Sequence, residues 1–363
     1  MTGRGVDQIL RHPCEPRIYE GYVKDARDYV RLAERPSGAV PRGVDDAYIW
    51  GDALEELARA KPDARIINLE TAVTRSDDWM DKGINYRMHP ANVGCLTAAG
   101  TDCCVLANNH VLDWGEGGLV ETLQTLRAAG LRTAGAGRNR EEAQAPAELL
   151  GSQRILVYSL GTRDSGIPPS WEATAARPGI GFLADLSERS ARELAERIRA
   201  ARRPGDLIVV SVHWGGNWGY RVPREQIEFA HQLVDSGAAD LVHGHSSHHP
   251  KAAEIYRGKL ILYGCGDFIN DYEGISGHEE FRGDLGVMYF PTLAGGSGEL
   301  LDLELVALCR RRLRLERAPE IDCQWLCGVL NAEGRRFGSS FDLRPRSRFA
   351  LRTPGVACRT ARG

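Results

Sequence analysis

The sequence predicts a protein of the α/β class. Short apolar runs that end in polar or glycine-rich turns alternate with amphipathic segments of helix length over most of the 363 residues. The apolar runs are continuous, which is typical of strands buried on both faces, so helices must cover at least one side of the sheet. From Asp284 onward, longer stretches alternate between apolar and polar residues, and this pattern indicates antiparallel strands.

Each expected element follows from a local pattern. Residues 117–129 should be helical because Leu119, Leu123 and Leu126 fall on one face of a helix. Residues 300–315 should be antiparallel strand, with Leu301, Leu303, Leu305 and Ala307 on one face. The other expected strands are residues 65–69, 102–107, 154–158, 206–212, 240–242 and 259–263, and the other expected helices are residues 187–202 and 224–236.

The composition excludes several classes of protein. The 46 basic and 49 acidic side chains give a formal net charge of -3, so the chain lacks the basic surplus of a nucleic-acid-binding protein. No apolar run approaches the roughly 18 residues of a membrane span, and the N-terminal segment is too charged for a secretory signal. Nine cysteines, an odd number, favour reduced thiols. We therefore expect a cytoplasmic protein without a membrane span.

Ligand-type side chains lie where four of the expected strands end. Open α/β sheets bind ligands outside the carboxyl ends of their strands, so these positions are the first to consider for chemistry. Together they offer carboxylate, amide and imidazole groups. The four segments are residues 68–71 (NLET), 107–113 (ANNHVLD), 213–216 (HWGG) and 243–250 (HGHSSHHP).

Taken singly, most of these residues have a structural explanation. Glu70 can be a surface acid, Asn109 a turn residue, and His213 a buried histidine with its hydrogen bonds satisfied. The segment 243–249 is different because it holds four histidines in seven residues. Imidazole is the commonest metal-ligand side chain, so this segment favours metal binding.

The four strand ends together suggest a site for two divalent ions. Such a pair clamps a phosphoryl or carbonyl oxygen and activates a bridging water as the nucleophile. Mixed nitrogen and oxygen ligands suit manganese, iron, zinc or magnesium, and the sequence does not choose among them. The expected ligands are Glu70 as the bridging carboxylate, Asn109 as a neutral oxygen donor, and His213, His245 and His248 as nitrogen donors.

Two further residues are expected to act in catalysis. His110 is adjacent to Asn109 but should point elsewhere, which suits a general acid that protonates the leaving group. Asp113, three residues on, can orient that histidine. Trp214 and Trp218 can either wall the pocket or pack in the core.

Competing sites are less favoured. Residues 244–248 begin like the turn that carries a nucleophilic serine, but the second glycine of that motif is replaced by His248. Residues 135–140 lack the third glycine of a dinucleotide-binding loop. Cys103 and Cys104 lie inside an apolar strand, which favours a buried structural role over nucleophilic chemistry.

The ordered motifs resemble those of the CapA family, the poly-gamma-glutamate capsule synthesis proteins related to calcineurin-like metallophosphoesterases. The matching segments are NLET, ANNH with its later aspartate, HWG, GHSSHHP and residues 262–268 (LYGCGDF), and the resemblance covers about residues 1–293. It implies a metallophosphatase-like four-layer α/β/β/α sandwich with a dinuclear metal site at the strand ends. It also assigns Glu70, Asn109, His213, His245 and His248 as ligand positions, with His110 as the catalytic histidine.

The start of the chain departs from the family pattern. Family members open with an apolar strand that ends in Gly-Asp, and here the chain begins with the turn that follows it, residues 1–5 (MTGRG). We therefore expect a sandwich that lacks its first strand and a site that holds one ion poorly. Asp7 lies too far beyond the turn to replace the missing aspartate. Either the start codon lies upstream or the chain is a degenerate member.

Two functions follow from the resemblance. The first is a metal-dependent hydrolase of a phosphoester or a gamma-glutamyl-type amide, acting on an anionic small molecule or a poly-gamma-glutamate-like substrate. The second is a non-catalytic component of a polymer-synthesis assembly with a degenerate metal site. Possible anion clamps are Arg221, Arg224 and Arg282.

The resemblance also suggests how the chain is divided. Residues 1–320 should form the metallophosphatase-like domain, and residues 321–363 should add a C-terminal helix and an arginine-rich tail. After Asp342 the chain carries many arginines and no acid, so a solvated or frayed end is expected there. Cys323 and Cys327 lie in the expected helix without a second cysteine pair, which argues against a structural zinc site.

Overall fold

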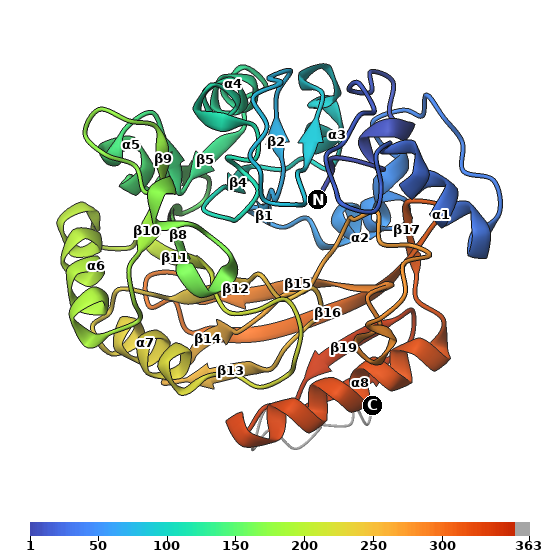
Figure 1. Ribbon diagram of the computed structural model, residues 1–363. Helices are drawn as coiled ribbons and strands as arrows, with labels where there is room; N and C mark the ends of the chain where they lie inside the picture. The colour runs from blue at the N-terminus through green and yellow to red at the C-terminus, as the bar shows by residue number, and fades with distance from the viewer. Residues whose placement is uncertain (353–363) are drawn as a thin grey trace.

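The computed structural model describes residues 1–352, which contain helices and five separate β-sheets (Figure 1). The helices are α1 (Arg27–Ser37), α2 (Ala53–Ala60), α3 (Gly94–Ala98), α4 (Gly115–Ala128), α5 (Arg140–Gln144), α6 (Glu188–Ala201), α7 (Arg224–Asp235) and α8 (Glu320–Gly334). Short 3-10 helices occupy Asp7–Ile9, Tyr48–Trp50, Pro90–Asn92, Arg163–Ser165, Pro169–Trp171, Glu279–Phe281 and Arg335–Phe337.

The largest sheet has seven strands and is mostly parallel. Its order is β10-β8-β11-β12-β14-β13, and β7 pairs with β8. The pairs β7 with β8 and β13 with β14 are antiparallel, and the other pairs are parallel. The strands are β7 (Ala147–Leu150), β8 (Arg154–Thr162), β10 (Phe182–Leu183), β11 (Leu207–His213), β12 (Leu241–His245), β13 (Ala253–Tyr256) and β14 (Lys259–Leu262).

The remaining strands form four smaller sheets. The parallel sheet β1-β4-β5 contains β1 (Ile66–Asn68), β4 (Cys103–Val105) and β5 (Arg132–Ala134). An antiparallel sheet in the order β15-β16-β19-β18, with β17 also paired to β16, contains β15 (Leu285–Leu293), β16 (Leu300–Arg311), β17 (Arg314–Arg317), β18 (Phe341–Arg344) and β19 (Arg348–Leu351). Two-stranded pairs are β2 (Ala72–Val73) with β3 (Arg87–Met88), and β6 (Ala136–Gly137) with β9 (Gly179–Ile180).

Three hydrophobic clusters show how these elements are layered. The outer face of the seven-stranded sheet packs against α6 and α7, through residues such as Val210, Leu194 and Phe229. Its other face packs against the three-stranded and five-stranded sheets, where Val209 clusters with Val105 and Leu305. The far side of those two sheets is covered by α2, α3, α4 and the N-terminal segment. The order is helices, sheet, sheets, helices.

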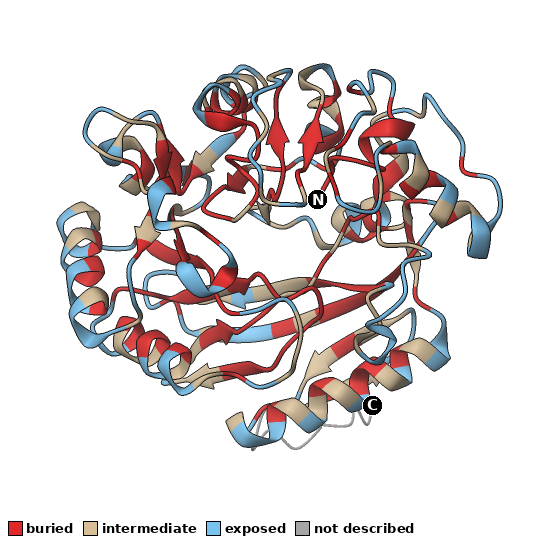
Figure 2. Cartoon of the chain, viewed as in Figure 1, coloured by how far each residue is buried: buried red, intermediate tan, exposed pale blue. Residues whose placement is uncertain are grey.

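This arrangement confirms the α/β class, and the metallophosphatase-like sandwich stays a prediction. The strand β11 is buried on both faces, as its continuous apolar run predicts (Figure 2). In contrast, Ile66 and Ile67 of β1 are only partly buried. The outer edge of β1 has no partner strand within residues 1–352, because β1 ends its three-stranded sheet.

The antiparallel stretch differs in one detail from its prediction. Leu301 was expected on the same face as Leu303, but its side chain is 65% exposed. The register of β15 and β16 shifts between Thr292 and Leu293, so Leu293 pairs with Leu300 and not with Leu301. This bulge breaks the alternation at the start of β16.

The expectation of a solvated or frayed end after Asp342 is wrong for the residues up to Leu351. Strands β18 and β19 extend the antiparallel sheet, and Phe341 and Phe349 are buried in its core. The alternating apolar residues of this segment form strands because one face of each packs against α8 and β16. Arg359 and Arg362 lie outside the described residues, and the division of the chain at residue 320 stays a prediction.

Two arginines of this C-terminal segment, Arg346 and Arg348, pair with acids of α2. The side chain of Glu56 is fully buried and accepts ion pairs from Arg59, Arg317 and Arg348. Burial alone would raise the pKa of Glu56, but hydrogen bonds from the three arginines outweigh it, and the pKa is lowered. The neighbouring Glu55 is 59% exposed. Glu56 therefore joins the N-terminal and C-terminal parts of the chain.

Two further expectations concern the state of the cysteines and the absence of a membrane span. All eight cysteines within residues 1–352 are free thiols, and Cys323 and Cys327 are buried on α8 in the hydrophobic core. Among the described helices, none combines the length and apolar character needed to cross a membrane.

We predict that Glu56→Gln destabilises the protein by about 2 to 3 kcal/mol, because it leaves partly buried arginines without their shared carboxylate. The matched variant Glu55→Gln, on the exposed neighbour, should cost much less, because ion pairs at the surface contribute little to stability. Urea unfolding of both variants at pH 7 measures the difference. Equal losses from the two variants would show that Glu56 does not hold the C-terminal strands in place.

Candidate functional site

The register of two parallel strands brings together the histidines at their ends. In the pairing of β11 with β12, His213 lies opposite His245 and Ser211 lies opposite His243. Side chains two residues apart on a strand point to the same face, so all four lie on one face of the sheet. Three of them are fully or nearly fully buried, and His243 is partly buried.

A chain of hydrogen bonds runs through these side chains to Asn109. His213 Nε2 lies 3.2 Å from Asn109 Oδ1, and His213 Nδ1 lies 2.6 Å from His245 Nδ1. On the other side of its ring, His245 Nε2 lies 2.8 Å from Ser211 Oγ. Ser211 Oγ also lies 3.0 Å from His243 Nδ1. The chain links the seven-stranded sheet to the turn that follows β4.

The side-chain oxygen of Asn109 determines which group donates and which accepts in every hydrogen bond of this chain. Because Asn109 Oδ1 only accepts, His213 Nε2 carries a proton and, in a neutral ring, His213 Nδ1 accepts from His245 Nδ1. His245 Nε2 then accepts from the hydroxyl of Ser211, whose oxygen accepts from His243 Nδ1. Burial lowers the pKa values of His213 and His245 well below normal and that of His243 to about 4. All three imidazoles are therefore neutral at pH 7.

The other side of the site is held by an asparagine that joins two strand ends. Asn108 Nδ2 donates to Asn68 Oδ1 at 3.0 Å and to the carbonyl of Leu69 at 2.9 Å. Glu70 accepts from Asn68 Nδ2 at 2.9 Å and lies 3.9 Å from His213 Nε2. Burial raises the pKa of Glu70. The carboxylate of Glu70 lies close to the histidine chain, but at 3.9 Å from His213 Nε2 it forms no hydrogen bond with that ring.

His110 and Asp113 form a hydrogen-bonded pair next to this chain. His110 Nδ1 lies 2.7 Å from Asp113 Oδ2, which also accepts from the backbone N–H of Tyr86 at 2.6 Å. Lys82 Nζ donates to Asp113 Oδ1 at 2.6 Å and to the carbonyl of Asn109. Asp113 is fully buried, so Lys82 supplies the positive charge that balances it.

The surroundings of His110 favour its neutral form. Burial lowers the pKa of His110 to about 4, since the attraction of Asp113 for the protonated ring is partly cancelled by Lys82. With Nδ1–H donating to Asp113, the lone pair lies on Nε2. The expected role of general acid requires a protonated ring, whereas the ring found here accepts a proton at Nε2.

His248 is not part of the hydrogen-bond chain of the other histidines and binds Asp267 instead. His248 Nδ1 lies 3.0 Å from both carboxylate oxygens of Asp267, which also accepts from Asn270 Nδ2 at 2.8 Å. Burial would lower the pKa of His248, but the charges of Asp267 and Glu70 outweigh burial, and the pKa is raised. His248 therefore forms an ion pair with Asp267.

The two tryptophans near the site have different roles. Trp214 is 2% exposed and packs in the core against Phe229 and Tyr263. Trp218 is partly exposed, and its ring centre lies 5.3 Å from that of His248. Trp218 is a wall of the site, and Trp214 belongs to the core.

Two of the three expected anion clamps are engaged elsewhere. Arg224 forms an ion pair with Glu228 within α7, and Arg282 forms one with Asp284. These pairs satisfy the guanidinium groups on the surface. Arg221 stays a prediction.

The competing sites show no activated nucleophile. Cys103 and Cys104 are fully buried, and burial raises the pKa of the Cys103 thiol to about 12. Ser246 has a left-handed backbone (φ 100°), which is strained for a residue other than glycine, and its hydroxyl donates to the carbonyl of Gly215 at 2.7 Å.

The carboxylate of Asp7 is engaged by hydrogen bonds to other parts of the chain. Its side chain is fully buried and accepts hydrogen bonds from Cys14 N, His89 N and Asn92 Nδ2. These contacts hold Asp7 against the segments that contain Cys14, His89 and Asn92.

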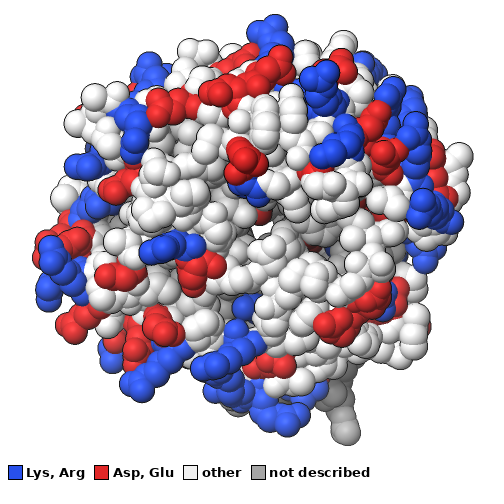
Figure 3. All heavy atoms as spheres, in the orientation of Figure 1, with Lys and Arg blue, Asp and Glu red and all other residues white. Residues whose placement is uncertain are grey.

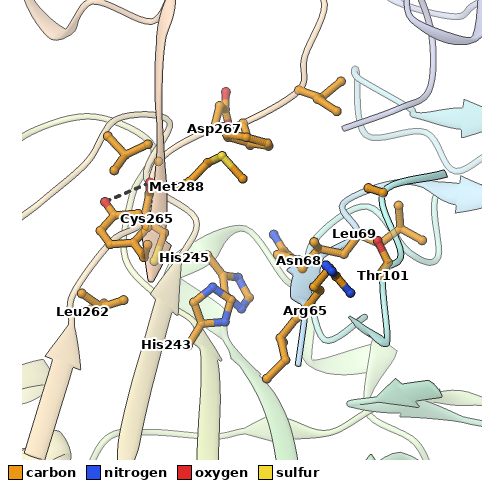
Figure 4. A pocket seen from close by; sticks show the side chains of 18 of the residues that line it. Arg65, Asn68, Leu69, Thr101, His243, His245, Leu262, Cys265, Asp267 and Met288 are labelled. Atoms are coloured by element: carbon orange, nitrogen blue, oxygen red, sulfur yellow. Dashed lines mark hydrogen bonds between the residues drawn. The ribbon is translucent and has the colours of Figure 1, made fainter. Parts of the chain in front are cut away.

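A cavity of about 310 Å³ opens beside the site, between the free edges of β1 and β15 (Figure 4). His243 and His245 face it from one side, and Asn68, Leu69 and Thr101 line the other. Most of its remaining lining is apolar. Neither edge pairs with another strand within the described part of the chain, which is why the two sheets stay separate.

The side chains at the strand ends are suitable donors for a divalent ion, but they do not surround a single ion position in this arrangement. Neutral imidazoles, an amide oxygen and a carboxylate are ordinary metal donors. Metal–nitrogen bonds of about 2.1 Å place two ligand nitrogens roughly 3.4 Å apart in a tetrahedral site, so His213 and His245 would have to separate. Within residues 1–352, no group of three His, Cys, Asp or Glu side chains is arranged to hold an ion.

Lys82 is a member of the site that was not predicted from the sequence. This residue lies in the loop between β2 and β3 and contacts both Asp113 and Asn109. Lysine is rare in the chain, with only five examples, and that rarity was the one available signal. The contact joins positions 31 residues apart, so spacing alone did not reveal it.

Comparisons with known proteins identify the family. A family model described as "Bacterial capsule synthesis protein PGA_cap" matches residues 1–272 of the chain. The chain is 46% identical over 349 residues to a probable polyglutamine synthesis accessory protein of Mycobacterium tuberculosis, covering 95% of this chain and 92% of the relative. It is 28% identical over 233 residues to the PGA biosynthesis protein CapA of Bacillus subtilis, covering 63% and 58%. The chain therefore belongs to the bacterial capsule synthesis protein family that includes CapA.

Proposed function

We propose that this protein is a metal-dependent hydrolase that acts in the synthesis of an anionic glutamate polymer or capsule, on a phosphoester or a gamma-glutamyl-type amide. The observation that carries the proposal is the meeting of Asn109, His213 and His245 from two sheets, with the His110–Asp113 pair beside them. The names of the relatives supply the biological setting.

Asn109, His213 and His245 would hold a divalent ion, with Glu70 as the nearest carboxylate. When bound, such an ion polarises a phosphoryl or carbonyl oxygen and activates water. Burial keeps the imidazoles neutral at pH 7, which is the charge state that binds metal. His248 is a candidate ligand for a second ion through Nε2 once that nitrogen is deprotonated, because its contact with Asp267 is made by Nδ1.

His110 would move protons at Nε2. Asp113 fixes the ring through Nδ1, and Lys82 holds Asp113 in place by an ion pair, so the lone pair of Nε2 can accept a proton from water. The protonated ring can then deliver that proton to the leaving group. The general-acid role expected from the sequence would thus follow a step as general base.

The surface bears on how an anionic substrate would be recognised. On the face shown in Figure 3, Lys and Arg side chains lie mainly around the rim and are interspersed with Asp and Glu, with few charges in the centre. This face has no broad basic track for a long polyanion. On this face, recognition of an anionic group would therefore not rely on a broad basic surface.

A second candidate function is a non-catalytic component of a polymer-synthesis assembly. One observation favours it: the candidate ligands in the described residues form hydrogen bonds with one another, and no three of the His, Cys, Asp or Glu side chains already surround an ion position. In this role the histidine chain would stabilise the junction between the two sheets.

We predict that the purified full chain binds Mn²⁺ or Zn²⁺ and that His245→Ala weakens this binding about tenfold or more, because it removes one of the buried nitrogen donors. His12→Ala is the matched control, since His12 is exposed and contacts its neighbours only through its backbone. Isothermal titration with each metal measures the affinities. Absence of binding by the native chain would favour the non-catalytic function.

We predict that His110→Ala lowers hydrolysis of bis-p-nitrophenyl phosphate or gamma-glutamyl-p-nitroanilide about a hundredfold or more, while metal affinity changes little. His110 is expected to transfer protons and does not belong to the Asn109–His213–His245 chain. Steady-state kinetics with both probes also decides between phosphoester and amide chemistry. Full activity in His110→Ala would remove this residue from the mechanism.

We predict that the metal-free protein loses stability as the pH falls below about 6.5, the ordinary pKa of histidine. His110 and His243 have pKa values of about 4 when folded, so the unfolded chain binds protons first and is favoured by acid. Each such histidine should cost about 1 kcal/mol between pH 7 and pH 5.5. Urea unfolding at the two pH values tests this, and equal stability would contradict the neutral, buried state of these rings.

A further inference from the structure

Arg4 lies in the interior of the protein close to the proposed site. It is 3% exposed and has a left-handed backbone (φ 54°), which is unfavourable for a residue with a side chain. The glycines on either side permit this placement, because a Cβ on Gly3 would lie 2.5 Å from Thr71 Oγ1 and one on Gly5 would lie 2.8 Å from Tyr29 Cβ. The Gly-Arg-Gly turn therefore serves to bring one guanidinium into the core.

Two buried carboxylates hold this guanidinium in a fixed orientation. Asp271 accepts from Arg4 Nε at 2.8 Å and from Nη2 at 2.6 Å, and Glu20 accepts from Nη1 at 2.9 Å. The side chains of both acids are 1% exposed or less. The bidentate pair with Asp271 requires the planar fork of arginine, which lysine does not provide.

The guanidinium also packs against the rings of two tyrosines. Its central carbon lies 3.5 Å from the ring centre of Tyr29 and 4.7 Å from that of Tyr86. The Tyr86 hydroxyl lies 3.2 Å from the hydroxyl of Tyr272, the residue next to Asp271. Arg4 therefore positions Tyr86 by packing against the tyrosine ring. It positions Tyr272 by binding the carboxylate of the preceding residue, Asp271.

Tyr86 and Tyr272 contact histidines on opposite sides of the proposed site. The ring of Tyr86 meets that of His110 edge-on, with centres 4.6 Å apart and an angle of 87°. The ring of Tyr272 meets that of His248 at 5.3 Å and 64°. His110 follows β4, whereas His248 follows β12, so the hydroxyl contact between the tyrosines bridges the two sheets.

We infer that Arg4 is a positioning residue of the site, which acts through Tyr86 and Tyr272 to fix the rings of His110 and His248 relative to each other. The inference rests on the proposed function for its catalytic meaning, but the contacts themselves are independent of any reaction. Arg4 touches neither histidine, so its effect passes only through the tyrosine pair.

The test is an NMR comparison of histidine ring signals in the full chain, with His110 and His248 assigned through His110→Gln and His248→Gln. Arg4→Lys should shift the signals of both rings and leave that of His231, on α7, unchanged. Arg154→Lys is the matched control. Arg154 also binds two carboxylates, Glu148 and Asp206, but it is the first residue of β8, at the end of that strand away from the site. It should move neither site ring.

A second variant keeps the test decisive if Arg4→Lys does not fold. Tyr272→Phe removes one hydroxyl and retains the ring, so it should shift the His248 signal and, through loss of the Tyr86 contact, the His110 signal. Unchanged site rings in a folded Arg4→Lys protein, or in Tyr272→Phe if the first variant is unfolded, would overturn the inference. Since no metal or substrate is needed, this result is separate from the success or failure of the hydrolase proposal.

Discussion

The pairing of His213 with His245 across two parallel strands is the contact on which the site depends. The register of β11 and β12 sets these residues side by side, and the lone acceptor oxygen of Asn109 then fixes which nitrogen of each ring carries a proton. Because the strands are buried on both faces, the rings are neutral and cannot turn to water. The same packing that stabilises the sheet therefore creates a set of nitrogen donors.

The second sheet completes the arrangement from the other side. Asn108 ties the turn after β4 to the end of β1, which carries Asn109 and His110 toward the histidines of β11 and β12. Around this junction, charges are balanced locally: Lys82 against Asp113, and Asp267 against His248. The N-terminal turn adds a third element, since Arg4 supports the tyrosines that contact both halves.

Sequence patterns predicted the strands and the polar side chains at their ends, but not how the strands pair. The run that ends at His213 and the histidine-rich segment after it were sufficient to predict two strand ends with imidazoles. The pairing of His248 with Asp267 was not predictable, because Asp267 approaches from the loop after β14. Lys82 and Arg4 were missed for the same reason: their partners lie 31 and 267 residues away in the chain. The C-terminal strands were mistaken for a solvated tail because their arginines outnumber the acids locally, whereas the balancing acid, Glu56, lies on α2.

The central claim is that the strand-end histidines form a metal-binding centre, and crystals soaked in Mn²⁺ or Zn²⁺ test it most directly. An anomalous difference map should show a peak within bonding distance of Asn109 Oδ1 and the ring nitrogens of His213 and His245, with the two rings moved apart from their 2.6 Å contact. Well-ordered crystals in which the histidine–histidine hydrogen bond persists and no peak lies at these side chains would contradict the account.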